Sequence, residues 1–226
     1  MSQKVKITKK DLRQDKFTMT MLQAKDNIVE HWIYYVGGLV VLFLLVFGIT
    51  YVKQEGQTKN VHASELFNRG MSEFMNKDYE LAASTFISVI DEFGSSVSAE
   101  KAMFNLGNAY FNNNNFDKAI ETFQEYLKKY GGKDKYFTTS AMAGIAASLA
   151  AKGEPQQAAD TYREAAERFE NFNLAGRYYI KAIEQYVAAD KVESAKVVFA
   201  KLKKDYVNTA YYDEALVVAA ENNLTQ

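Results

Sequence analysis

The hydrophobic and polar positions of the chain follow two patterns. Residues 33–52 read IYYVGGLVVLFLLVFGITYV and carry no charged side chain. A helix of about 20 residues spans the ~30 Å hydrocarbon core of a bilayer. A cleaved signal peptide is disfavoured because its apolar region is shorter and VKQEGQ, which follows, lacks a small-residue cleavage site. The pattern therefore predicts a transmembrane helix with aromatic interface residues at its ends, Trp32, Tyr34, Tyr35 and Tyr51.

Charge gives this helix an orientation. Residues 1–32 hold seven Lys and Arg against four Asp and Glu, a net charge of +3, whereas the chain after residue 52 has a net charge of −4. Positively charged flanks are retained in the cytoplasm. We expect a basic cytoplasmic tail at 1–32 and the rest of the chain across the membrane.

The tail also has a helical pattern of its own. Phe17, Met21, Ala24 and Ile28 follow the spacing i, i+4, i+7, i+11, which places them on one face of a helix. Such an amphipathic helix lies on a membrane surface or against a partner. The alternative is that it only extends the membrane anchor.

After a linker at 53–61, a repeat with helical spacing begins. Four stretches align without gaps from residues 68, 105, 144 and 181, with spacings of 37, 39 and 37 residues. Periods of this size are typical of solenoids built from helix pairs. The fifteenth position is always alanine and the nineteenth is always aromatic, and one turn apart they predict the contact between paired helices: Ala82, Ala119, Ala158 and Ala195, with Phe86, Phe123, Tyr162 and Phe199.

Turn-forming residues interrupt the pattern midway through each repeat, at 76–78, 112–115, 153–155 and 190. Pro155 suits the first turn of the helix that follows it. Asp190 with Glu193 predicts a capped helix start. Between repeats, the glycines of FGSS at 93–96 and of YGGK at 130–133 predict helix stops with a left-handed residue.

Composition excludes several classes of protein. Lys and Arg number 27 against 28 Asp and Glu, so a basic nucleic-acid-binding surface is not indicated. Without cysteine there is no disulfide, thiolate metal site or cysteine nucleophile. His31 and His62 flank the apolar segment on opposite sides, and no phosphate-binding glycine loop occurs. We expect no enzymatic activity, metal site, cofactor, nucleic acid or small-molecule substrate.

The second repeat carries a family pattern. The Leu, Gly, Tyr, Ala, Phe and Pro positions of the tetratricopeptide repeat are matched by Leu106, Gly107, Tyr110, Ala119, Phe123 and Gly131, with glycine replacing proline. The chain resembles this family over roughly residues 62–222. The resemblance implies an all-α solenoid at 62–226, with about four helix pairs and a capping helix from about Ala210 to Glu221.

In that family the first helix of each pair lines a groove that binds protein or peptide partners. The matching residues at spacing i, i+4, i+7 are Phe67, Met71 and Phe74, then Phe104, Asn108 and Phe111. They suit an extended apolar segment or an amphipathic helix, bound through aromatic rings and an amide. The alternative is that they form ordinary core between repeats.

The whole arrangement resembles bacterial membrane-anchored tetratricopeptide proteins, among them the ancillary subunit of the SecYEG translocon. Its repeats are also similar to those of the cell-division coordinator associated with the Tol-Pal system. The resemblance implies a single-pass inner-membrane protein whose periplasmic repeats hold exported proteins or chaperones near the translocon. One alternative is a scaffold subunit of a cell-envelope complex, held by self-association or permanent subunits. Another is a receptor with inverted topology that faces the cytosol.

Overall fold

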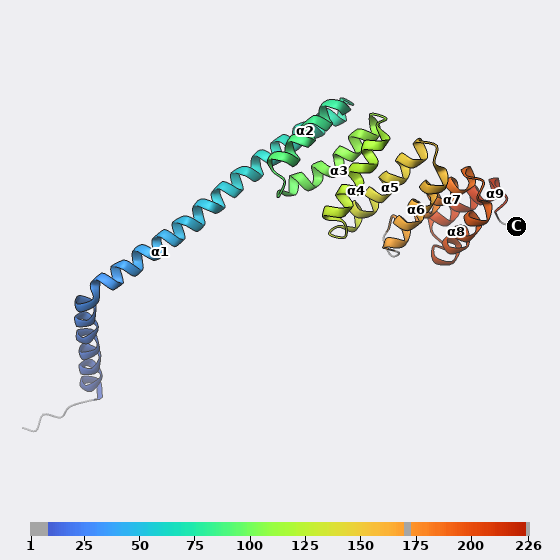
Figure 1. Ribbon diagram of the computed structural model, residues 1–226. Coiled ribbons are helices and arrows are strands. Elements are labelled where there is room, and N and C mark those ends of the chain that lie inside the picture. Colours follow the sequence, from blue (N-terminus) through green and yellow to red (C-terminus); the bar gives the residue numbers. More distant parts are fainter. Residues whose placement is uncertain (1–8, 170–172, 225–226) are drawn as a thin grey trace, which may run out of the picture. The chain divides into compact units, whose positions relative to one another are not determined.

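The computed structural model describes residues 9–169 and 173–224, and within them it contains nine helices and no strand (Figure 1). The chain divides into two compact units, Met1–Gln57 and Thr58–Gln226. Lys4 and Lys6 of the predicted basic tail lie outside the described residues. Helix α1 (Lys9–Met75) contributes to both units, so the predicted linker at 53–61 is helical.

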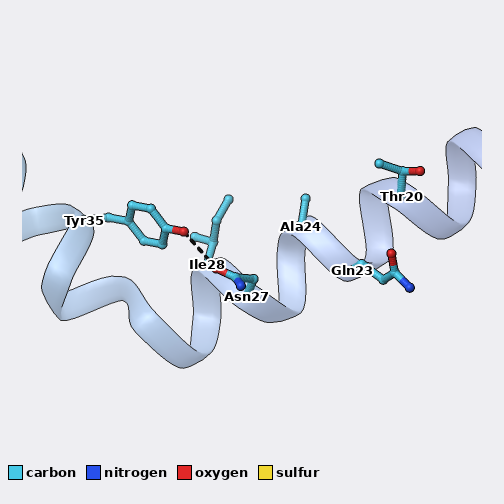
Figure 2. Close-up of a pocket in the computed structure, with 6 residues that line it drawn as sticks. All are labelled: Thr20, Gln23, Ala24, Asn27, Ile28 and Tyr35. Atoms are coloured by element: carbon cyan, nitrogen blue, oxygen red, sulfur yellow. Dashed lines mark hydrogen bonds between the residues drawn. The ribbon is translucent and has the colours of Figure 1, made fainter.

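Within the first unit, α1 bends at His31, whose backbone is not helical (φ −116°, ψ 17°). The Nδ1 atom of His31 lies 3.2 Å from the carbonyl oxygen of Asn27. The Tyr35 hydroxyl reaches back across the bend and donates to Oδ1 of Asn27 at 2.8 Å (Figure 2). Side chains that enter the main-chain hydrogen-bond ladder are a known cause of helix kinks. The bend separates the tail from the apolar segment that follows.

The second unit is a stack of helix pairs (Figure 1). The C-terminal part of α1 pairs with α2 through ring contacts such as Phe67 to Phe86, with ring centroids 5.9 Å apart. The remaining helices are α2 (Tyr79–Glu92), α3 (Val97–Asn112), α4 (Phe116–Tyr130), α5 (Lys135–Ala151), α6 (Pro155–Arg168), α7 (Ala175–Ala188), α8 (Val192–Asp205) and α9 (Ala210–Glu221). The predicted all-α solenoid and its last helix are confirmed.

The alanine and aromatic positions of the repeat form the contact inside each pair. All four alanines are completely buried, and the four aromatic residues are at most 8% exposed. Phe123 lies between two glycines of successive first helices. A Cβ atom on Gly107 would approach its ring to 2.6 Å, and one on Gly144 would approach it to 2.4 Å. The absence of side chains at these positions lets α3 and α5 close on one ring.

The first helices of all four pairs end in the same way. A residue in the left-handed region follows each of them: Lys77, Asn114, Gly153 and Asp190, with φ of 66°, 59°, 82° and 55°. The next amide donates to the carbonyl five residues back, as Asp78 does to Glu73 at 3.0 Å. This is the Schellman motif. Helix α9 ends with it too, at Asn223, so α9 has the ending of a first helix.

Two predicted turn details are wrong. Asp190 does not cap the start of α8, because it takes the left-handed position that ends α7 and Lys191 is the N-cap residue. Gly94 of the predicted FGSS stop is not left-handed, whereas Gly132 of the predicted YGGK stop is, with φ of 88°. Pro155 does begin α6, as predicted.

Candidate protein-binding face and membrane segment

The first three predicted groove residues lie on the C-terminal part of α1. Phe67, Met71 and Phe74 are partly buried and pack against the core shared with α2. The Phe74 ring contacts Tyr79 of α2 with centroids 5.3 Å apart. Each side chain therefore contributes to packing and keeps part of its surface open. Their role in partner binding stays a prediction.

Phe104 of α3 contacts more aromatic rings than the other predicted residues. Its ring centroid lies 5.9 Å from Phe123, 5.8 Å from Tyr126 and 5.1 Å from Phe137. These partners belong to α4 and α5, so Phe104 joins two successive repeats. Phe111, two turns further along α3, contacts only the ring of Phe116 among the described ring pairs, at 5.6 Å.

Asn108 lies between these two phenylalanines in the sequence of α3, and the structure adds two neighbours to it. Asn105 and Asn112 follow the same helical spacing, three residues before and four residues after. Their Nδ2 atoms donate to the carbonyls of Lys101 and Asn108, at 2.9 and 2.8 Å. We call these three residues the asparagine stripe. Sequence reasoning missed it, although the i, i+3, i+7 spacing was visible.

One carboxylate on the first helix of each of the first two repeats contacts the second helix of its pair. Glu73 is 9% exposed and accepts from the Thr85 hydroxyl at 2.6 Å and from Nε of Arg69 at 3.0 Å. Glu100 lies 3.4 Å from the Tyr126 hydroxyl, which donates to it. Burial, followed by the charge of Glu100, raises the pKa of Tyr126 well above its usual value. Both acids thus serve the contact within a helix pair.

None of the residues that the structure describes covers the apolar segment of α1. Within the part of the chain that the structure describes, one helix is long and apolar enough to cross a membrane, with a mean hydropathy of 2.3 and none of its most apolar stretch buried. The predicted interface residues Trp32, Tyr34, Tyr35 and Tyr51 are all at least half exposed. Exposed apolar surface of this extent needs hydrocarbon or a protein partner around it.

Residues 9–32 of the tail are helical, and residues 16–32 are exposed. Ala24 and Ile28 of the predicted apolar face line a shallow pocket together with Thr20, Gln23, Asn27 and Tyr35 (Figure 2). The pocket mixes small apolar and uncharged polar side chains. Among the described residues, no group of three or more His, Cys, Asp or Glu side chains is placed to hold a metal ion.

A stack of paired helices with alanine and aromatic contacts defines a helical-repeat protein, a class of protein–protein interaction modules. The chain matches the family described as tetratricopeptide repeat-like domain over residues 25–173, and it belongs to that family. The matched region takes in the apolar segment and the first three helix pairs. Tetratricopeptide proteins are in general protein-binding modules rather than enzymes.

Two solved structures at low sequence identity show the same fold. The putative kinesin light chain nearly identical TPR-like repeats of Podosopora anserina, and a single-residue variant of them, are each 11% identical to this chain, with a TM-score of 0.56. Each comparison covers 72% of this chain and 87% of the other. The TPR2AB domain of yeast Sti1 in its pHSP90 complex is 16% identical, covering 73% and 86%, with a TM-score of 0.33. No curated protein sequence matches the chain.

Proposed function

We propose that this protein is a membrane-anchored protein-binding module that holds exported polypeptides or their chaperones near the bacterial secretion translocon. One observation carries the proposal: a single chain joins an exposed apolar helical segment without charged residues, 33–52, to a tetratricopeptide stack. The first feature fixes the protein at a membrane, and the second supplies a surface for polypeptides. The matched family region includes both.

The basic tail supports a topology with the N-terminus in the cytoplasm and the repeats in the periplasm. The tail carries a net charge of +3, and the chain beyond the apolar segment carries −4. Positive charge close to a membrane helix is retained on the cytoplasmic side. A reporter enzyme fused to the C-terminus would be active in the periplasm. Activity in the cytoplasm instead would overturn this part of the proposal.

Anchoring gives such a module its mechanism. A binding surface held at the membrane meets a chain that emerges nearby at a high effective concentration, so modest affinity is enough for capture. The partly buried side chains of the first two repeats, among them Met71 and Asn108, are the proposed contact positions. A partner seated there touches the open edges of residues whose other edges pack in the core.

Cross-linking in native membranes tests the proposal. A photoreactive residue at Met71 should capture translocon subunits together with a varied set of exported proteins, identified by mass spectrometry. The same residue at Val197, which is 70% exposed on α8, is the matched control and should capture little. Adducts with the chain itself or with one fixed set of envelope subunits would indicate the permanent scaffold instead. Equal capture at both positions would show that the predicted face has no special role.

A further inference from the structure

The helix of the tail presents a row of apolar side chains to its surroundings. Phe17, Met21, Ala24 and Ile28 lie on one side of this helix, and Figure 2 shows Ala24 and Ile28 pointing the same way. We call these four residues the tail stripe. Its three large members, Phe17, Met21 and Ile28, are 54–64% exposed. Contiguous exposed apolar surface marks a site for lipid or for a protein partner, and the side chains around the stripe distinguish the two.

The charged side chains of residues 16–32 are sorted around the tail stripe. At about 100° per residue, Lys16 and Lys25 lie on opposite flanks of the stripe, whereas Asp26 and Glu30 lie on the far side of the helix. A lysine on the flank can extend its apolar stem beside the stripe and place its ammonium group among lipid phosphates. Carboxylates on the far side stay in water. This distribution of charge complements the surface of an anionic bilayer.

The bend at His31 lets the tail leave the direction of the apolar segment. A helix that continued straight from residue 33 would carry Phe17 about 24 Å beyond the end of that segment, at 1.5 Å per residue. Most of the tail stripe would then face water. Asn27 holds the bend, because its carbonyl oxygen lies 3.2 Å from Nδ1 of His31 and its Oδ1 accepts from the Tyr35 hydroxyl at 2.8 Å (Figure 2). A tail turned into the plane of the membrane surface places the whole stripe at one depth.

We propose that the tail helix lies in the interfacial layer of an anionic bilayer, with the tail stripe toward the acyl chains and Lys16 and Lys25 at the level of the lipid phosphates. The inference rests on the proposed membrane anchor and adds a second contact with the same bilayer. Lipid is the favoured occupant, because the apolar segment at 33–52 places a bilayer beside Ile28 and the tail carries a net charge of +3. A helix that lies flat at one end also restricts rotation of the anchor about its own axis.

Spin labels on the full-length protein in lipid nanodiscs test the inference. The chain has no cysteine, so one introduced cysteine carries one label. The labelled positions are Ala24 in the tail stripe, Glu30 on the far side and Leu42 in the apolar segment. The readout is the ratio of the label's collision rates with oxygen, which concentrates in lipid, and with a nickel chelate, which stays in water. In nanodiscs that contain phosphatidylglycerol we expect a high ratio at Ala24 and Leu42 and a low ratio at Glu30. In phosphatidylcholine alone the ratio at Ala24 should fall.

Two methionines give a matched pair of variants. Met21 belongs to the tail stripe and is 56% exposed, whereas Met19 lies on the opposite side of the helix and is 64% exposed. Met21→Gln should shift the equilibrium of the tail from lipid toward water about tenfold, and Ile28→Gln added to it should shift it about tenfold further, because each change removes an apolar side chain from lipid. The ratio at Ala24 should fall accordingly. Met19→Gln should leave that ratio unchanged, and circular dichroism verifies that the variants keep their helices.

The outcomes separate this inference from the proposed function. A high ratio at Leu42 with low ratios at both Ala24 and Glu30 would keep the membrane anchor and overturn the interfacial helix, leaving the tail stripe to a protein partner. High ratios at all three positions would make the tail an extension of the spanning helix and would also overturn the inference. Equal effects of the two methionine changes, or equal ratios at Ala24 in the two lipids, would contradict the orientation or the choice of anionic lipid. A low ratio at Leu42 would show that the apolar segment lies outside the bilayer, and both proposals would fail.

Discussion

The clearest structural prediction concerns the ring of Phe123, which is 1% exposed and lies between two glycines. In Gly144→Ala the new methyl group would lie 2.4 Å from Cε2 of that ring, whereas ordinary contacts begin at 3.4 Å. The ring or the helix must therefore move by about 1 Å. Movement toward α3 is restricted, because Gly107 lies at the opposite edge of the ring: a Cβ atom built on it would be only 2.6 Å from Cε1 of Phe123.

Two effects of opposite sign decide the magnitude. Overpacking a well-filled core costs about 1–3 kcal/mol. Alanine in a helix interior gains about 1 kcal/mol over glycine. We expect Gly144→Ala to lower the free energy of unfolding of the repeats by about 1–2 kcal/mol. Gly56→Ala is the control: Gly56 is also within a helix, but in the described structure nothing lies within 4 Å of the Cβ position.

Urea unfolding of the full chain in detergent micelles, followed by far-ultraviolet circular dichroism, measures these changes. Phe123→Leu combined with Gly144→Ala should cost less than the sum of the two single changes, because the smaller side chain makes room for the methyl group. A Gly144→Ala protein that is about 1 kcal/mol more stable than the wild type would refute the reasoning. Helix propensity alone would then act at that position, and the close contact with Phe123 would not exist.

Three further predictions address the helix ends, the tyrosines and the membrane segment. Lys77→Gly should raise and Gly153→Ala should lower the urea midpoint, because a left-handed backbone costs a lysine or an alanine about 1–2 kcal/mol. Burial raises the pKa of Tyr162 to about 12, whereas an unfolded tyrosine titrates near 10. The stability that protonated Tyr162 contributes is therefore complete below about pH 10 and is lost as the pH rises toward about 12. Urea unfolding at alkaline pH should show a smaller loss of stability for Tyr162→Phe than for the wild type. The apolar side chains of residues 33–52 favour membrane insertion by roughly 6 kcal/mol, and one Arg near the centre of the helix costs about 3 kcal/mol. Leu44→Arg should therefore leave the protein in the membrane fraction. Arg at both Leu42 and Leu44 should release part of the protein from it.

The sequence predicted the helix pairs because their determinants are local and recur. An alanine and an aromatic ring one turn apart are visible at a period of 37–39 residues, and all eight side chains are buried as expected. The last helix, α9, has the bounds that the resemblance to the repeat family implied. One alanine–aromatic pair would be weak evidence for a helix pair, but its recurrence in four repeats identifies the fold.

Two details of the fold could not be predicted from the sequence, the role of Asp190 and the bend at His31. Aspartate suits two different backbone conformations, and the contact at the bend follows no periodic pattern. Asp190 suits both an N-cap and a left-handed C-terminal residue, and the choice depends on where α7 stops packing. The bend at His31 depends on Asn27 and Tyr35, eight residues apart, meeting across it at 2.8 Å. No periodic pattern reports a contact of that kind.

The candidate binding face contains aromatic rings that pack in the core and an amide that does not, and this difference leads to a last prediction. Phe104 contacts three rings of α4 and α5, so Phe104→Ala should unfold the stack more readily, by up to about 3 kcal/mol for a ring that is only partly buried. Asn108→Ala removes an amide that the core does not use and should change stability by less than about 0.5 kcal/mol.

Partner capture and urea unfolding measured on both variants therefore separate packing from recognition. If Asn108→Ala loses capture at unchanged stability, the amide contacts the partner. If capture falls only in proportion to unfolding across both variants, the first helices contribute rigidity alone, and the partner must bind another face of the repeats. The rings alone could never have distinguished these two cases, because each of them packs in the core and is predicted to touch the partner as well.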